Sequence, residues 1–158
     1  MNRRRFTDLF LFAAVLAATA GFARAAHAQN ADLYVRGAKQ HVHGVNQAWF
    51  FGRYGTDIGY NPLHRDWGCG YNSGTANAWL ADMKRMHINV VRVWLFEDME
   101  GLTFDGSGYV NGVQSTFLSN LDDLIAKANA NGLALYLTFL NHNLSNQRGQ
   151  TLPGGATI

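Results

Sequence analysis

Residues 89–101, NVVRVWLFEDMEG, contain a predicted strand that is apolar on both faces. Side chains alternate between the two faces of a strand, so Arg92 and Trp94 share one face. The other face is aliphatic and consists of Val91, Val93 and Leu95. Such a strand is typical of a parallel sheet that is covered on both sides. Arg92 is therefore expected away from free solvent, where a guanidinium needs a carboxylate or a ligand as its partner.

Two predicted helices flank this segment, and each joins the strand that follows it almost without a linker. Apolar residues at helical spacing predict a first helix that Ser73 or Thr75 caps and that runs to about His87. A second helix ends at Gly132, and the strand LALYLTFL starts directly after it. The apolar stripe of this second helix is Phe117, Leu118, Leu121, Leu124, Ile125 and Ala128. An RGAK hairpin and the extended run HGVNQAW come first, so the order is strand, helix, strand, helix, strand.

The joins from helix to strand are short, whereas the loops from strand to helix are long. A (β/α)8 barrel has this asymmetry, because the loops after the strands carry its active site. A flavodoxin-like or Rossmann sheet shares the element order, but no G-x-G-x-x-G sequence and no phosphate-binding loop follows any strand. The sequence therefore predicts an α/β fold with about three βα units of a TIM barrel. A whole barrel takes about 250 residues, so the chain is expected to hold a little under half of one.

The N-terminal residues are typical of an export signal. The basic NRRRF segment, the apolar run over residues 9–23 and the small-x-small sequence AHA predict a signal peptide over residues 1–28, with the mature chain starting near Gln29. The apolar run is shorter than the roughly 20 residues that span a bilayer, which favours secretion over a signal anchor. RRRF also resembles a twin-arginine signal, although Thr7 replaces the usual leucine, so Sec and Tat export both stay open. We expect a secreted or periplasmic protein with no membrane contact after cleavage.

Charge and cysteine content argue against several classes of function. Of 13 Lys and Arg and 11 Asp and Glu, four basic residues and one acidic residue lie in the signal, which leaves nine and ten. The basic balance therefore belongs to the export signal, and nothing indicates nucleic-acid binding. The single cysteine, Cys69, has no Cys or His at close spacing around it. No disulfide, metal site or cofactor is expected.

A long segment without periodicity, residues 49–75, follows the first strand. A loop of that length inside a compact domain is either functional or a mistaken assignment. A sugar-stacking surface explains its many rings, and a self-packed loop with its own small core explains them equally well. The rings are Trp49, Phe50, Phe51, Tyr54, Tyr60, Trp67 and Tyr71.

The predicted strand ends bring a small set of polar and aromatic residues together. Alternation along the third strand places Tyr136, Thr138, Leu140 and His142 on one face, which is expected to line the barrel axis. Residues at the carboxyl ends of barrel strands converge on one pocket. The candidate substrate-binding residues are Asn46, Trp49, Arg92, Trp94 and His142.

With these residues the chain resembles the N-terminal part of a clan A glycoside hydrolase, closest to the cellulase and mannanase family 5. The matching segments are HGVNQAWF, WLADMKRMHINVVRVWLFED and FLSNLDDLIAKANANGLALYLTFLNH, which cover most of residues 33–142. The resemblance implies a retaining hydrolase of β-1,4-linked glucan or mannan on a (β/α)8 barrel. Residues 29–158 would be an incomplete domain of such an enzyme, with a polysaccharide or oligosaccharide as substrate.

The resemblance also implies roles for two residues of the site. Arg92 matches the second-strand arginine that hydrogen-bonds the catalytic nucleophile, and His142 matches the histidine that lines subsite −1. A structural alternative for Arg92 is an ion pair with a local carboxylate such as Asp57 or Glu97. For His142 the alternative is a hydrogen-bonded core histidine.

Both catalytic glutamates of that family end later strands, so neither lies within these residues. Retaining hydrolysis needs two carboxyl groups about 5 to 5.5 Å apart. Glu97 and Glu100 share one loop with Asp98, and we expect all three to be solvated charges without a catalytic role. The same loop, residues 97–114, holds a DG turn at 105–106 that predicts a small hairpin.

The sequence leaves two alternatives beside a fragment of a hydrolase. One is a non-catalytic carbohydrate-binding module that uses the aromatic loop and the Arg92 and His142 pocket without chemistry. The other is a truncated gene product with no activity. An Asn-Glu pair at the end of a further apolar strand, followed by more βα units, would favour the hydrolase.

Overall fold

The computed structural model describes residues 33–35, 37–140, 148–152 and 155–157. The chain divides into two units, residues 1–39 and 40–158. At their boundary, β1 (Leu33–Val35) pairs with β2 (Ala38–Gln40), as the RGAK turn predicts. The second unit holds all the other elements.

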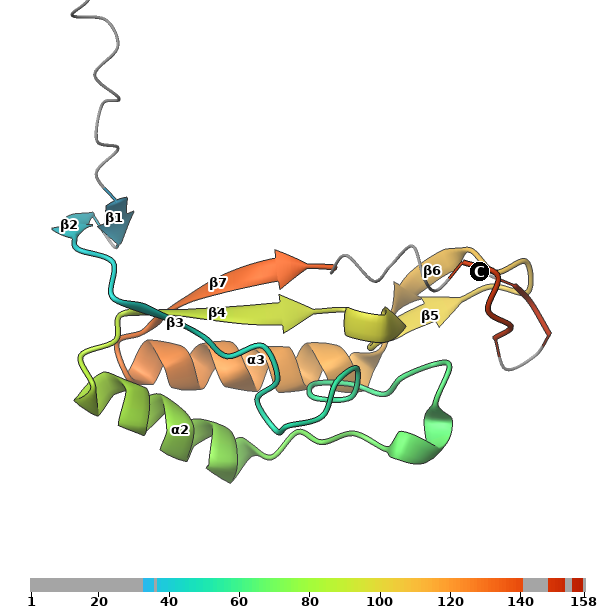
Figure 1. The fold of residues 1–158 in the computed structure, drawn as a ribbon, viewed down its shortest axis with the longest axis horizontal. Coiled ribbons are helices and arrows are strands. Elements are labelled where there is room, and N and C mark those ends of the chain that lie inside the picture. The colour runs from blue at the N-terminus through green and yellow to red at the C-terminus, as the bar shows by residue number, and fades with distance from the viewer. Residues whose placement is uncertain (1–32, 36, 141–147, 153–154, 158) are drawn as a thin grey trace, which may run out of the picture. The chain divides into compact units, whose positions relative to one another are not determined.

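A three-stranded parallel sheet organises the second unit. Its strands are β3 (Gly44–Asn46), β4 (Val90–Leu95) and β7 (Ala134–Phe139), in the order β3-β4-β7. Helix α2 (Ser73–Arg85) lies between β3 and β4 in the chain, and α3 (Ser115–Ala130) lies between β4 and β7. Figure 1 shows both helices on the same side of the sheet. Consecutive parallel strands with helical crossovers on one side are the repeating unit of a (β/α)8 barrel, so the predicted element order is confirmed.

The hydrophobic core lies between this sheet and its two helices. Strand β4 contributes the aliphatic set that alternation predicts, Val91, Val93 and Leu95. The helices contribute Ala76, Leu80, Met83, Phe117, Leu124 and Ala128. Leu118 and Ile125 are exposed, so the buried stripe of α3 is narrower than predicted, because the sheet covers only part of the helix surface. Within the described residues, no helix combines the length and apolar character needed to cross a membrane.

The ends of the helices follow local capping rules, with one correction. Asn72, not Ser73 or Thr75, is the N-cap of α2, and its side-chain oxygen accepts a hydrogen bond from the backbone N–H of Thr75. Helix α3 ends at Ala130 with Asn131 as its C-cap, and Gly132 follows with a φ of 76°, as predicted. Each helix therefore stops just before the strand that follows it.

The predicted hairpin after β4 is confirmed. Strand β5 (Leu102–Phe104) pairs antiparallel with β6 (Val110–Val113) across the DG turn. Gly101 precedes β5 with a φ of 75°, and a Cβ there would lie 2.2 Å from Cδ2 of Phe117. Only glycine therefore lets the first turn of α3 pack this closely against the start of the hairpin.

Candidate functional site

The register of the parallel sheet brings three predicted site residues together. Asn46 pairs with Arg92, Arg92 pairs with Tyr136, and Trp94 pairs with Thr138 two residues further along. Residues in register in a parallel sheet project from the same face. This face lies opposite the one that the helices cover, because the alternate residues of β4 form the core. His142 lies outside the described residues.

Arg92 is held by two neighbours on this face. Its Nε donates a 2.9 Å hydrogen bond to Oγ1 of Thr138. Its guanidinium carbon lies 4.9 Å from the centroid of the Trp94 ring, a cation–π arrangement. Together these contacts orient the guanidinium across β4 and β7.

An ion pair of Arg92 with a local carboxylate is not among the ion pairs of the described residues. The ion pairs among them join His64 to Asp98, Arg85 to Asp82 and Lys127 to Asp123, and none includes Arg92. Asp57 instead accepts hydrogen bonds from the backbone N–H groups of Phe51 and Arg53. These hydrogen bonds of Asp57 are therefore to the backbone of loop 49–75 and not to Arg92.

Trp94 supplies a second polar group to the same face. Its Nε1 is buried and has no hydrogen-bond partner among the described residues. Buried indole N–H groups usually find a partner. The donor is therefore available to a group that binds at this face.

Trp49 lies after β3, with its ring partly in solvent and its edge anchored. The side chain is 47% exposed, and Nε1 donates a 2.6 Å hydrogen bond to Oε2 of Glu97. The ring also meets Tyr54 edge-on, with centroids 6.2 Å apart. Sequence reasoning placed Trp49 in the site but missed its link to Glu97, because 48 residues separate the two partners.

The expectation that Glu97, Asp98 and Glu100 are solvated is wrong. All three are buried, Glu97 and Glu100 each at 2% exposure. Phe96, Asp98 and Met99 have positive φ values, and this tight turn directs the carboxylates inward. Loop 49–75 folds over the turn and supplies the donors, which a single sequence does not reveal.

Asp98 and Glu100 each hold a different part of that loop. Asp98 accepts a 2.8 Å hydrogen bond from Nδ2 of Asn61. Glu100 Oε1 accepts from the backbone N–H of Ile58 and, at 2.6 Å, from that of Gly59. Burial raises the pKa of Glu100 to about 8 and that of Asp57 to about 6, which outweighs the opposite effect of their backbone hydrogen bonds.

The raised pKa of Glu100 predicts a pH-dependent stability. Between its ordinary value of 4.5 and about 8, the folded protein binds a proton that the unfolded chain has released. The free energy of unfolding should therefore fall as the pH rises through this interval, by up to about 1.4 kcal/mol per pH unit. Glu100→Gln keeps a neutral acceptor for the same N–H groups, so this fall should become shallower.

Thermal unfolding of both proteins between pH 6.5 and 8 measures the difference. This range lies above the pKa of Asp57, whose titration would otherwise add to that of Glu100. Parallel pH profiles for the wild type and Glu100→Gln would contradict a buried carboxyl that is neutral at pH 7.

The aromatic residues of loop 49–75 divide into two groups. Phe50 is buried, and Phe51 stacks on Trp79 of α2 with centroids 5.9 Å apart. Tyr71 donates a 2.7 Å hydrogen bond to Asp123 of α3. The exposed rings are Trp49, Tyr60 and Trp67. The interpretation of a separate small core is therefore wrong for these rings, because they pack into the hydrophobic core of the sheet and helices. Three rings stay on the surface of the loop.

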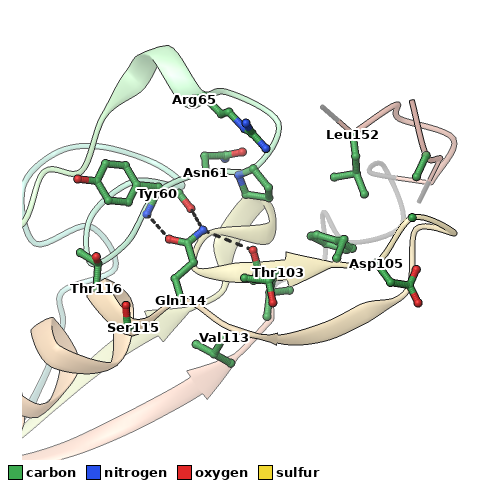
Figure 2. A pocket seen from close by; sticks show the side chains of 15 residues that line it. Tyr60, Asn61, Arg65, Thr103, Asp105, Val113, Gln114, Ser115, Thr116 and Leu152 are labelled. Carbon is green, nitrogen blue, oxygen red and sulfur yellow. Dashed lines mark hydrogen bonds between the residues drawn. The ribbon is translucent and has the colours of Figure 1, made fainter. Parts of the chain in front are cut away.

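A separate pocket of about 840 Å³ lies between this loop, the β5–β6 hairpin and the residues Leu152 and Ala156. Figure 2 shows the Gln114 amide in its wall, bonded to the backbone N–H and C=O of Tyr60 at 3.1 and 3.0 Å. Of the predicted site residues that the structure describes, none lines this pocket. It is therefore distinct from the face that carries Arg92 and Trp94.

Comparison with known proteins agrees with this geometry. The chain is 29% identical over 129 residues to a mannan endo-1,4-beta-mannosidase of Mytilus edulis, covering 81% of the chain and 33% of that protein. It is 30% identical over 122 residues to a mannan endo-1,4-beta-mannosidase of Cryptopygus antarcticus, covering 75% of the chain and 30% of that protein. No family model matches the chain.

A solved structure gives the same result. The X-ray structure of the beta-mannanase from the blue mussel Mytilus edulis matches 76% of this chain with a TM-score of 0.55 and 28% identity. The chain spans about a third of the length of the curated relatives it matches, 33% and 30%. The predicted resemblance to a glycoside hydrolase and the predicted part of a TIM barrel are therefore confirmed.

Proposed function

We propose that this chain, whose relatives are mannan endo-1,4-beta-mannosidases, is the N-terminal part of a secreted retaining glycoside hydrolase that cleaves β-1,4-linked mannan. The observation that carries the proposal is the row of Asn46, Arg92 and Tyr136 on one sheet face, with Trp94 and Thr138 beside it. In a (β/α)8 barrel this face lines the axis, and the carboxyl ends of its strands carry the active site. The similarity to mannanases favours mannan over glucan.

In this proposal Arg92 acts as a preorganised partner of the catalytic nucleophile. Thr138 and Trp94 already fix its guanidinium, so little side-chain freedom is lost when a carboxylate approaches. Asn46 lies beside it in register, and the buried Nε1 of Trp94 offers a donor to the sugar or to a catalytic group. His142 lies outside the described residues, and its part in the proposed −1 subsite rests on the family resemblance alone.

Turnover of defined substrates tests the function. The complete protein should release mannooligosaccharides from mannan and should act less well on carboxymethyl-cellulose. Proton NMR of the first product should show retained β-anomeric configuration, because a covalent glycosyl-enzyme intermediate gives double displacement. Binding of mannan without cleavage would favour a carbohydrate-binding module instead, and neither binding nor cleavage would favour an inactive gene product.

Export of the protein is part of the same proposal. We expect cleavage of residues 1–28, so that material outside the cytoplasm begins near Gln29. N-terminal sequencing of exported protein checks this. Exported material that still carried the arginines at residues 3–5 would contradict a cleaved signal.

A further inference from the structure

We infer that Glu97 is a positioning residue that holds the exposed indole of Trp49 in place as a stacking surface for a sugar ring of the bound mannan chain. The inference rests on the proposed function, and it adds a residue on which recognition of longer substrates depends. Its structural basis is the hydrogen bond between these two side chains and the backbone of the turn that carries Glu97.

The contact joins a buried carboxylate to a ring at the surface. Oε2 of Glu97 accepts the Nε1–H of Trp49 at 2.6 Å, while Glu97 is 2% exposed and Trp49 is 47% exposed. This distance is at the short end for a hydrogen bond between an N–H group and an oxygen acceptor. The polar edge of the indole is therefore fixed inside the protein, and much of the ring stays accessible to a ligand.

A second contact restricts the ring from another side. Tyr54 meets Trp49 edge-on, at 6.2 Å between centroids and an interplanar angle of 81°. A side chain fixed by a hydrogen bond and a ring contact has few rotamers left to lose on binding. Preorganisation of this kind raises affinity because the ordering cost is met before the ligand arrives.

The turn that delivers Glu97 is strained. Three residues other than glycine have left-handed backbone angles there: Phe96 at φ 59°, Asp98 at 50° and Met99 at 65°. Such conformations cost free energy and persist where the surrounding structure enforces them, which is most often at functional sites. The turn directly follows β4, at the strand end where a barrel carries its active site.

The carboxylates of this turn differ in what they bind. Glu100 accepts backbone N–H groups at Ile58 and Gly59, and so holds the loop itself. Glu97 accepts a hydrogen bond from a side chain whose ring reaches the surface. An aromatic ring presents a flat apolar face to the C–H groups of a pyranose, while its polar tip keeps a hydrogen bond. The arrangement of Trp49 therefore suits a sugar ring outside the cleaved bond.

Four variants of the complete enzyme test the inference: Glu97→Ala, Glu97→Gln, Trp49→Phe, and Glu97→Ala combined with Trp49→Phe. Binding of mannohexaose is followed by calorimetry, and KM and kcat are measured on mannohexaose and on an aryl β-mannoside. Glu97→Ala should raise the Kd and KM for mannohexaose about tenfold, as expected for loss of the buried hydrogen bond that orients the ring. Turnover of the aryl mannoside should change by less than about twofold, because its single sugar ring does not reach Trp49 and the two sites act independently.

The other variants separate positioning from a purely structural role. Glu97→Gln keeps an acceptor for the indole N–H and should retain most of the wild-type affinity for mannohexaose. Trp49→Phe lacks the N–H and should bind mannohexaose more weakly than the wild type. Adding Glu97→Ala to Trp49→Phe should change the Kd by less than about twofold, because the coupling is already lost. The Trp49 emission, obtained as the difference from Trp49→Phe, should shift in Glu97→Ala. Glu100→Gln, in the same turn, is the matched control and should leave the Kd unchanged.

Several results would overturn the inference. One is a loss of kcat/KM in Glu97→Ala that is equal for mannohexaose and the aryl mannoside. Another is a Kd for the double variant that equals the product of the two single effects. A third is a Trp49 emission spectrum that is the same in Glu97→Ala as in the wild type. A wild-type enzyme that binds mannohexaose without cleaving mannan would contradict the proposed function while the binding and emission measurements still decide the role of Glu97. A wild type that neither binds nor cleaves would overturn both.

Discussion

Replacing Arg92 by alanine in the complete enzyme should lower kcat/KM for mannan by about 10² or more. The guanidinium is held in place by the hydroxyl of Thr138 and the ring of Trp94, so it meets a reacting carboxylate without reorganisation. Removing one preorganised electrostatic partner typically costs about 2.7 to 4 kcal/mol of transition-state stabilisation. Because no ion pair within the described residues includes Arg92, the loss should appear in catalysis more than in folding.

Steady-state kinetics and thermal unfolding measured on the same preparations check this prediction. Arg85→Ala is the matched control, since it removes an exposed arginine of α2 that pairs with Asp82. It should leave kcat/KM within about twofold of the wild type, because exposed ion pairs contribute little. An Arg92→Ala enzyme with normal turnover, or one that loses activity only through unfolding, would give Arg92 a structural role instead.

Residues 29–158 expressed alone should hydrolyse no β-glycan and should not remain monomeric. Within the described residues, β3 and β7 each pair with β4 alone, which leaves a backbone edge on both outer strands. Tyr136 and Phe139 of β7 are 62% and 64% exposed. Unpaired strand edges beside apolar side chains favour association with another copy. Inactivity follows from the proposal that the acid and the nucleophile lie on later strands.

Light scattering and assays on mannan, carboxymethyl-cellulose and aryl β-glycosides test both parts. The complete enzyme, assayed in parallel, provides the positive control for each substrate. A monodisperse monomer whose turnover is abolished by Glu97→Gln or Glu100→Gln would refute the half-barrel proposal. It would place the active site in the acidic turn after β4.

Much of the architecture could be predicted from the sequence because local rules determine it. Alternation along β4 assigned Val91 and Val93 to the core and Arg92 to the opposite face, as the burial pattern confirms. Gly132 marked the end of α3, since its left-handed conformation is one that glycine adopts readily. The sequence also grouped Asn46, Arg92 and Trp94 in one predicted pocket, because all three lie toward the ends of predicted strands. The register of the sheet places them on one face.

The environment of the acidic turn was decided by tertiary structure alone. Glu97, Asp98 and Glu100 resemble solvated loop charges in sequence, yet each is buried against donors about 40 residues away in loop 49–75. The side-chain orientations also depend on a backbone turn with positive φ values at residues other than glycine, so no glycine in the sequence marks the turn. Local sequence determines alternation and capping, which act over a few residues, whereas the burial of a carboxylate depends on which distant N–H groups the fold brings to it.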